Sequence, residues 1–315
     1  MREKSLIQQI GRRIRPGAAV PVGIGDDCAV LRLPAGHELL VTTDFTLEGV
    51  HFRREWHPPE VVGWRCMTRG LSDIAAMGGE PRAAFLSLAL ERGTPQRWVN
   101  RFLSGLLEAA AEFRVTLAGG DTAQAPNGIL ADIVLVGSVP RGKAVLRSGA
   151  RPGEGIYVTG ELGGSAAALT HLREGKVRAA DYYRHFHPTA RIAVGQRLRR
   201  LASAMIDISD GLSTDLEHIC EESGVGAQIE TAIIPRARVG RPEKQVSLDL
   251  ALHGGEDYEL LFTSAKEIPA KVAGVRVTRI GRITRGHAME LIEGDGHRRR
   301  LVARGWEHFK TDVGP

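Results

Sequence analysis

A segment rich in Gly, Arg and Pro, PRGKAVLRSGARPGEG at 140–155, divides the chain into two halves that both alternate between strand-like and helix-like patterns. Glycine and proline interrupt regular secondary structure, so the boundary falls near 145–150. Mixed strands and helices in each half are typical of α/β-type domains. A chain of 315 residues is long enough for two hydrophobic cores. We therefore predict an α/β (α+β mixed) fold with domains at 1–145 and 146–315.

Hydrophobic periodicity places the elements of the first half. Apolar residues at helical spacing predict helices at 3–14, 59–78 and 95–113. Short alternating or continuous apolar runs predict strands at 28–33, 38–44, 83–90, 115–120 and 128–139.

The second half restarts with a strand and repeats the alternation. Strands are predicted at 156–160, 204–210, 226–230, 258–263 and 277–283. Helices are predicted at 163–172, at 192–202 and from Leu212. The segment HFHPTAR (185–191) is less regular: Pro188 indicates a helix start, and we interpret His185 and His187 as structural rather than as a metal pair.

Charge and apolar content exclude several classes of protein. The formal net charge is +5, but the basic residues are scattered, and the one dense run, HRRR, is not accompanied by a recognition helix or an aromatic RNA-binding motif. We therefore predict no nucleic-acid partner, although a basic surface helps to attract an anionic substrate. The longest apolar runs are far shorter than the roughly 20 residues of a membrane helix, so no membrane is predicted.

The N-terminal segment and the cysteines indicate a reducing compartment. MREKSLIQQIGRRIR is charged and lacks an apolar signal core, which predicts a cytoplasmic protein. The three cysteines, Cys28, Cys66 and Cys220, form no CxxC pair, so neither a disulfide framework nor a thiolate zinc site is predicted.

Short motifs rich in Gly, Ser or Thr hold more than half of the 14 aspartates. Aspartate keeps its charge close to the backbone, and glycine lets that backbone approach a ligand. A single Asp after Gly is also typical of a turn or a helix N-cap, but capping requires neither six such motifs nor an adjacent Asp pair. Short carboxylates beside small residues are candidate magnesium ligands. The aspartates in these motifs are Asp26, Asp27, Asp44, Asp73, Asp121, Asp210, Asp215 and Asp257.

Taken in order, these motifs resemble the thiamine-monophosphate kinase family of the aminoimidazole-ribonucleotide-synthetase-like ATP-binding superfamily. The resemblance runs from about residue 5 to GWEHF at 305–309. It implies ATP-dependent conversion of thiamine phosphate to thiamine diphosphate. It also implies a homodimer, in which the N-terminal sheets of two subunits form a barrel-like core and a C-terminal α/β domain covers each site. The motifs are GIGDDCAV, TTDFTLEGVHF, GLSDIAAMGGEP, LAGGDT, LRSGARPGEGIYVTG, IDISDGLSTDL and GGEDYELLFT.

This reaction gives the aspartates a physical purpose. The attacking phosphate oxygen is already ionised near neutral pH, so no general base is needed. Two unit charges about 4 Å apart repel by about 4 kcal/mol at an effective dielectric near 20, and two phosphates carry more charge than that. Several Mg²⁺ ions cancel the repulsion and align an in-line transfer. The chain has no GxxxxGK[ST] loop, so ATP would depend on metal-loaded carboxylates and glycine loops.

Carried over residue by residue, the resemblance implies three sets of site residues. The metal set is Asp27, Thr42, Thr43, Asp44, Asp73, Asp121, Asp210 and Asp215. The nucleotide set is Gly120, Asp121, Arg147 and Ser213. The substrate set is His51, Glu256 and Trp306.

Other interpretations stay open for several of these residues. Arg147 also fits a surface arginine, His51 a structural histidine and Trp306 a packing residue. Asp26 and Asp257 fit orienting roles, and Phe113 is the nearest aromatic before the GGD loop, where the family often has one with a hydroxyl. The number of ions, any monovalent cation, the kinetic order and sharing of the site between subunits are not fixed by the sequence.

Two other functions compete with the kinase. One is another ATP enzyme of the superfamily: aminoimidazole ribonucleotide synthetase, selenophosphate synthetase or the hydrogenase-maturation dehydratase. Cys28 follows GDD and has apolar neighbours, which fits the reactive cysteine of a selenophosphate synthetase poorly. The other is a non-catalytic nucleotide- or metal-binding regulator, which would bind ATP without turnover.

Overall fold

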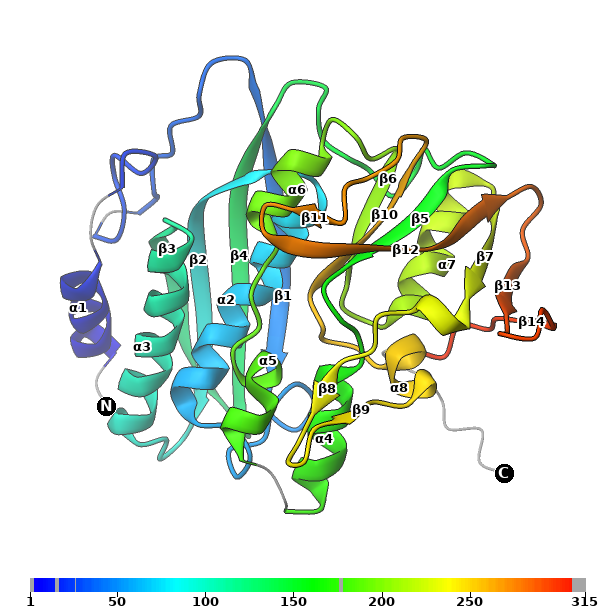
Figure 1. Ribbon diagram of the computed structural model, residues 1–315. Helices are drawn as coiled ribbons and strands as arrows, with labels where there is room; N and C mark the ends of the chain where they lie inside the picture. The colour runs from blue at the N-terminus through cyan, green and yellow to red at the C-terminus, as the bar shows by residue number, and fades with distance from the viewer. Residues whose placement is uncertain (1–2, 15–16, 26, 176–177, 308–315) are drawn as a thin grey trace. The chain divides into compact units, whose positions relative to one another are not determined.

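The computed structural model describes residues 3–14, 17–25, 27–175 and 178–307 (Figure 1). The chain divides into two compact units, Met1–Ala144 (unit 1) and Val145–Pro315 (unit 2). Each unit combines helices with a mixed sheet, so the prediction of a mixed α/β architecture is confirmed. No helix among the described residues is long and apolar enough to cross a membrane.

Unit 1 is a four-stranded sheet with helices on one face (Figure 1). The strand order is β1-β4-β2-β3, with β2 and β3 parallel and the other neighbours antiparallel. The strands are β1 (His37–Leu47), β2 (Glu80–Glu91), β3 (Thr116–Ala125) and β4 (Ile129–Pro140). The helices are α1 (Glu3–Arg13), α2 (Pro59–Ala76) and α3 (Gln96–Glu112).

The helix pair α2 and α3 packs closely because two glycines lie between them. A Cβ on Gly63 would come within 1.9 Å of the Phe102 carbonyl oxygen, and one on Gly105 within 1.8 Å of the Glu60 carbonyl oxygen. The predicted strand at 28–33 is wrong: the segment makes only an isolated bridge, Val22 to Val30. An apolar run alone does not supply the partner strand that a ladder needs.

Unit 2 is built on an eight-stranded sheet whose main path runs β14-β13-β7-β12-β5-β10-β6, with β11 paired to β12. Its strands are β5 (Gly155–Thr159), β6 (Ala204–Ile208), β7 (Gly226–Glu230), β10 (Glu259–Ser264), β11 (Lys271–Val272), β12 (Val275–Thr284), β13 (Met289–Ile292) and β14 (Arg298–Arg300). A separate hairpin pairs β8 (Arg238–Val239) with β9 (Lys244–Gln245). The helices are α4 (Gly164–Arg173), η1 (Ala179–Tyr182), α5 (Tyr183–Phe186), α6 (Ile192–Leu198), α7 (Leu212–Ser223), η2 (Thr231–Ile233) and α8 (Leu248–His253).

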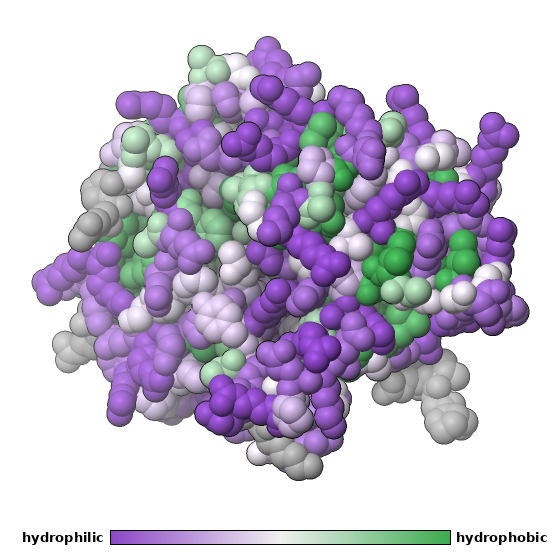
Figure 2. Space-filling view, viewed as in Figure 1, coloured by the Kyte–Doolittle hydropathy of each residue, from purple (hydrophilic) through white to green (hydrophobic). Residues whose placement is uncertain are grey.

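The core of unit 2 forms where α7 covers apolar strands. Leu216 and Ile219 of α7 belong to the same buried cluster as Val158, Ile206 and Leu261 of three neighbouring strands. Burying such side chains contributes roughly 1.5–3 kcal/mol each relative to leaving them exposed. In the view of Figure 2 the surface is mostly hydrophilic, with hydrophobic residues in small separate patches.

The segment at 185–191 departs from its prediction. The short helix α5 precedes Pro188, and the next helix begins at Ile192 rather than at the proline. His185 is buried, and its Nδ1 lies 2.8 Å from Ser165 Oγ, which agrees with a structural role for this histidine.

Candidate active site

The predicted metal residues of β1 face both sides of the unit 1 sheet. Side chains alternate along a strand, so Thr42 and Asp44 share one face and Thr43 the other. Burial shows which face is covered: Leu40 and Thr46 are buried on the side of Thr42 and Asp44, whereas Val41 and Phe45 are exposed. The TTD motif therefore divides between a helix-covered face and an open one.

The helix-covered face brings together Thr42, Asp44 and Asp73. The Thr42 hydroxyl donates a hydrogen bond to Oδ2 of Asp73, which α2 carries. Arg69, one helical turn before Asp73, places its Nε 3.9 Å from Oδ1 of Asp44. The nearby Cys66 is fully buried, and burial raises its pKa to about 12, so this thiol stays protonated. This group therefore holds two short carboxylates, a hydroxyl and a cation.

The open face carries a row of polar residues across β4, β2 and β3, which Thr43 of β1 joins through a hydrogen bond. The register pairs Phe45 with Asp132, Asp132 with Ser87, and Ser87 with Asp121. Thr43 Oγ1 donates to Asp132 Oδ1 at 2.6 Å. Asp132 and Ser87 were not among the predicted site residues. The sequence could have indicated them, because each is a polar residue within an otherwise apolar strand and alternates with buried residues.

A cavity of about 660 Å³ in unit 1 gathers the residues of two glycine-rich motifs. Asp27 and Asp121 both line it, and apolar residues such as Leu88 and Leu117 supply much of its wall. Phe85 is the aromatic residue of the lining, whereas Phe113 ends α3 and is not among the lining residues. Asp26 lies outside the described residues. The cavity therefore offers an apolar wall beside two carboxylates.

Gly120 is required by the sheet itself. Its φ is +149°, and a Cβ there would lie 1.9 Å from the Leu86 carbonyl oxygen of the neighbouring strand. No other residue fits that backbone position. The adjacent Asp121 is exposed, and its Oδ1 accepts a hydrogen bond from the Thr122 N–H at 2.8 Å. The glycine thus fixes the place from which the Asp121 carboxylate extends.

In unit 2, Asp210 and Asp215 lie at the turn between β6 and α7. Oδ2 of Asp215 accepts hydrogen bonds from the N–H groups of Asp210 and Gly211, at 3.3 and 3.0 Å. Burial raises the pKa of Asp215 well above its ordinary value, and the charges of Asp207 and Asp210 act in the same direction. Three carboxylates here repel one another, so added positive charge would stabilise their ionised forms.

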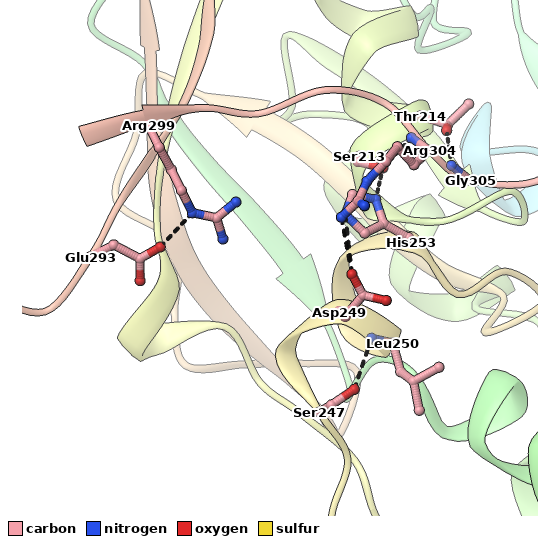
Figure 3. A network of polar contacts seen from close by, with 10 residues as sticks. All are labelled: Ser213, Thr214, Ser247, Asp249, Leu250, His253, Glu293, Arg299, Arg304 and Gly305. Atoms are coloured by element: carbon pink, nitrogen blue, oxygen red, sulfur yellow. Dashed lines mark hydrogen bonds and ion pairs between the residues drawn. The ribbon is translucent and has the colours of Figure 1, made fainter. Parts of the chain in front are cut away.

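Ser213 takes part in a network that the sequence did not reveal (Figure 3). Its Oγ lies 2.7 Å from Nδ1 of His253, whose Nε2 is 2.9 Å from Nη2 of Arg304. Arginine only donates, so Nε2 accepts and the neutral imidazole carries its hydrogen on Nδ1. Burial lowers the pKa of His253, as does the neighbouring Arg304. Ser213 Oγ therefore accepts from His253, which leaves the hydroxyl hydrogen for another acceptor.

The loop at 254–258 and the C-terminal segment lie against the same turn. Glu256 N–H donates to the Ser209 carbonyl at 2.7 Å, and Trp306 N–H donates to the Asp210 carbonyl at 3.0 Å. Glu256 and Tyr258 both have positive φ, at 64° and 52°. Such strain costs about 1–3 kcal/mol per residue and is typical of functional loops. The Trp306 residue is 51% exposed.

Asp257 is turned away from this loop toward the start of α4. Its two carboxylate oxygens accept from Gly163 N–H at 2.6 Å and Ser165 N–H at 3.3 Å. Burial raises its pKa to about 7, while these two donors act in the opposite direction. Asp257 therefore joins the loop to α4, which agrees with an orienting role.

The remaining predicted residues lie in loops. Nδ1 of His51 accepts from Leu47 N–H at 3.0 Å, so the neutral ring carries its hydrogen on Nε2. Arg147 is exposed, and its carbonyl accepts from Ser223 Oγ at 3.3 Å. Across the described ranges, no three His, Cys, Asp or Glu side chains are arranged so that they alone could hold a metal ion.

Two family models match the chain. The model of the AIR synthase related protein N-terminal domain matches residues 25–139, and that of the C-terminal domain matches residues 151–293. Together they span most of the sequence, and they meet at the Gly- and Arg-rich segment.

Individual relatives are similar over nearly the whole length. Thiamine-monophosphate kinase of Escherichia coli K12 is 39% identical over 325 residues, which is 98% of either chain. The crystal structure of thiamine-monophosphate kinase from Stenotrophomonas maltophilia K279a is 34% identical, with a TM-score of 0.80 over 93% of this chain and 95% of that one. The structure of AaThiL complexed with AMPPCP and TMP is 33% identical, with a TM-score of 0.78 over 98% and 99%.

Proposed function

We propose, from the premise that this chain belongs to the thiamine-monophosphate kinase family of AIR synthase related proteins, that it converts thiamine phosphate and ATP to thiamine diphosphate and ADP. The observation that carries the proposal is its full-length similarity to a kinase whose structure holds AMPPCP and TMP. The protein is an enzyme, a thiamine-phosphate kinase. Its phosphoryl transfer is direct and in line, with no general base.

Several Mg²⁺ ions are part of the proposal, and the donor chemistry fits them. Mg²⁺ prefers oxygen ligands and is usually bound by one or two carboxylates together with substrate phosphates. On the helix-covered face of the unit 1 sheet, Asp44 and Asp73 supply two such carboxylates. When bound, the ions would neutralise the charge of the two phosphates. The ligands would be Asp27, Thr42, Thr43, Asp44, Asp73, Asp121, Asp210 and Asp215.

Neighbouring side chains orient the proposed metal ligands and compensate their charge. Thr42 keeps the Asp73 carboxylate oriented through its hydrogen bond. Arg69 lies beside Asp44 and compensates its negative charge. Thr43 contributes a backbone oxygen, because its side chain points to the face of the sheet opposite to Thr42 and Asp44. A cation bound beside Asp215 would lower its pKa and so favour the ionised carboxylate as a ligand.

Nucleotide binding is assigned to the unit 1 cavity, which Gly120 and Asp121 line, and to two further residues, Arg147 and Ser213. The apolar wall that includes Phe85 suits the adenine, and Gly120 fixes the backbone from which the Asp121 carboxylate extends beside the phosphates. Arg147 is exposed and presents a planar fork that suits phosphate. His253 Nδ1–H donates to Ser213 Oγ, so the hydroxyl hydrogen of Ser213 is available for donation to the nucleotide.

Thiamine phosphate is assigned to His51, Glu256 and Trp306. The thiazolium of thiamine is cationic, so an exposed indole face and a carboxylate both attract it. Trp306 is half-exposed and is tied by its backbone to the Asp210 turn. His51 presents Nε2–H as a donor for the substrate's phosphate.

A homodimer completes the proposal. The open face of the unit 1 sheet exposes Leu39, Val41 and Phe45 of β1, at 49%, 60% and 54%. Exposed apolar side chains gathered on one face of a strand are typical of a protein interface. A second copy placed against this face would bury these side chains and form the barrel-like core.

The direct test is product analysis by mass spectrometry with thiamine phosphate, ATP and MgCl₂. Formation of thiamine diphosphate and ADP in equal amounts supports the kinase. ATP binding without turnover would favour a non-catalytic regulator. ATP consumption that yields no thiamine diphosphate would favour another enzyme of the superfamily. Omission of Mg²⁺, with EDTA present, is expected to abolish product formation.

A further inference from the structure

A second cavity, of about 500 Å³, lies within unit 2 and is lined by four arginines. Arg236 and Arg238 come from the segment that leads into the β8–β9 hairpin, and Arg276 and Arg279 come from β12. Glu161 is the only acidic residue in the described lining. The lining thus carries four positive charges and one negative charge, a net charge of +3.

Backbone hydrogen bonds hold the three segments that supply these arginines. Gly160 N–H donates to the Arg276 carbonyl at 2.9 Å, and Leu162 N–H donates to the Pro235 carbonyl at 2.8 Å. Ala237 N–H returns to the Leu162 carbonyl at 2.9 Å. These bonds hold the backbone segments that carry the arginines next to one another, although the segments are far apart in sequence.

The arginines themselves are only partly compensated. Arg236 donates to neutral acceptors, the Gln245 side chain at 2.8 Å and the Val246 carbonyl at 3.3 Å. Glu161 is shared with Arg184, which lies 3.4 Å from it outside the cavity lining. The side chains of Arg276 and Arg279 make no hydrogen bond or ion pair with any described residue. Arg238 pairs with Glu243, which lies outside the cavity lining, across 3.8 Å in an ion pair that is exposed to solvent. Protein anions therefore match only part of the positive charge here.

A buried hydroxyl in the lining also lacks a partner. Oγ1 of Thr278, which lies between the two β12 arginines in sequence, is inaccessible to solvent and makes no hydrogen bond. Leaving such a donor unsatisfied is unfavourable. The lining also includes the apolar residues Ala232, Ile233 and Pro235. The cavity thus combines hydrogen-bond donors, positive charge and an apolar surface.

The geometry points to a binding site for a small organic molecule that bears a diphosphate group. A diphosphate carries about three negative charges near neutral pH, which matches the net charge of the lining, and guanidinium forks bind phosphate oxygens in pairs. The volume lies in the range of small-molecule sites. No residue assigned above to the kinase reaction lines the cavity, so this inference does not rest on the proposed function.

The test is calorimetric titration of the full chain with inorganic pyrophosphate, ADP and orthophosphate. EDTA is present, because the kinase site is proposed to need divalent ions. We expect pyrophosphate and ADP to bind, and orthophosphate to bind at least about tenfold more weakly, because it makes fewer charged hydrogen bonds. Tighter binding of ADP than of pyrophosphate would identify a nucleoside diphosphate as the ligand, and equal binding a diphosphate group alone.

Matched variants locate the binding. Arg276→Gln/Arg279→Gln should weaken pyrophosphate binding about 100-fold, since two charged forks are lost. Arg200→Gln/Arg285→Gln removes the same charge from exposed positions outside the cavity and should change the affinity less than about twofold. Absence of binding to the wild-type chain, or an equal loss in both double variants, would overturn the site.

A single substitution keeps the test decisive if the arginine pair is needed for folding. Thr278→Val removes the unpaired hydroxyl and should leave the melting temperature unchanged or higher. The same variant should bind pyrophosphate about threefold to tenfold more weakly. Wild-type affinity in a folded Thr278→Val protein would contradict the proposed use of this cavity.

Discussion

Aspartates in similar glycine-rich motifs have different surroundings in the two units. In unit 1, Asp27 and Asp121 are exposed beside a cavity, and Asp44 keeps access to solvent next to Arg69. In unit 2, Asp215 and Asp257 accept backbone N–H groups, and burial raises the pKa of both. The motif therefore does not determine the role. In unit 1 the aspartates are accessible to a ligand. In unit 2 the carboxylates of Asp215 and Asp257 bind the backbone of a turn or a helix start.

The two units also differ in how their sheets are covered. The β1 strand of unit 1 leaves apolar side chains exposed on one face, whereas every residue of β5, β6 and β10 in unit 2 is buried. A sheet with an uncovered apolar face is available for a partner, and a fully covered one is not. These differences predict that a second copy covers the open sheet face of unit 1, whereas strands β5, β6 and β10 of unit 2 need no further cover.

The largest expected effect tests the exposed carboxylates of unit 1. Asp121→Asn should lower turnover at least about 100-fold, because a carboxylate proposed to bind Mg²⁺ loses its charge. The melting temperature should change little, since Asp121 is exposed. Asp295→Asn, in the exposed turn between β13 and β14, is the matched control and should retain full activity. Near-normal turnover in folded Asp121→Asn protein would remove this residue from the metal site.

The second largest expected effect is a loss of stability when a buried carboxylate of unit 2 is replaced. Asp257→Asn should destabilise the fold by about 1–3 kcal/mol, because one of two backbone donors loses its acceptor. The loss is measured by urea unfolding. An unchanged unfolding midpoint would show that Asp257 does not support the loop.

The same variant has a defined pH dependence. The folded pKa of Asp257, about 7, lies above the ordinary value near 3.9, so the native state binds more protons than the unfolded chain between these values. The contribution of this carboxyl to stability is therefore full below the unfolded value near 3.9 and is lost progressively as the pH rises from there through about 7. The gap in unfolding free energy between wild type and Asp257→Asn should narrow from pH 5 to pH 8. A gap that widens would have the wrong sign for a raised pKa.

A moderate effect tests the uncovered sheet face. Val41→Lys places a charge at an exposed apolar position of β1 and should shift the chain from dimer to monomer in sedimentation velocity, weakening association about tenfold or more. Lys244→Glu, on the exposed β9 strand of unit 2, should leave association unchanged. A wild-type chain that is monomeric at all concentrations would rule out the proposed dimer.

The smallest effect concerns the Ser213 network. The pKa of His253 is lowered by burial and by Arg304, so its contribution to stability is present above pH 6.5 and is lost as the pH falls through the lower folded value. His253→Gln should reduce the loss of unfolding free energy between pH 7 and pH 5 by less than about 1 kcal/mol. This change is measured as a smaller fall in melting temperature over that pH range. It should also raise the KM for ATP severalfold, because Ser213 loses its orienting donor. A purely structural histidine would leave the KM for ATP unchanged.

The sequence by itself determined most of the local structure and the chemical inventory. Helical spacing at 59–78 and 95–113 corresponds to α2 and α3, and the apolar run at 128–139 corresponds to β4. These predictions succeeded because periodicity is a local property of the chain. The ordered aspartate motifs also identified the family, since their residue types and spacing are fully present in the sequence.

Only the tertiary structure decided which groups meet. Strand alternation separates Thr42 from Thr43 in any sheet, but the packing of α2 decides which of them is covered. The pairing of Thr43 with Asp132, and the four arginines around one cavity, join positions far apart in sequence. The physical reason is that contacts between distant segments depend on strand order, register and burial, none of which a local pattern contains.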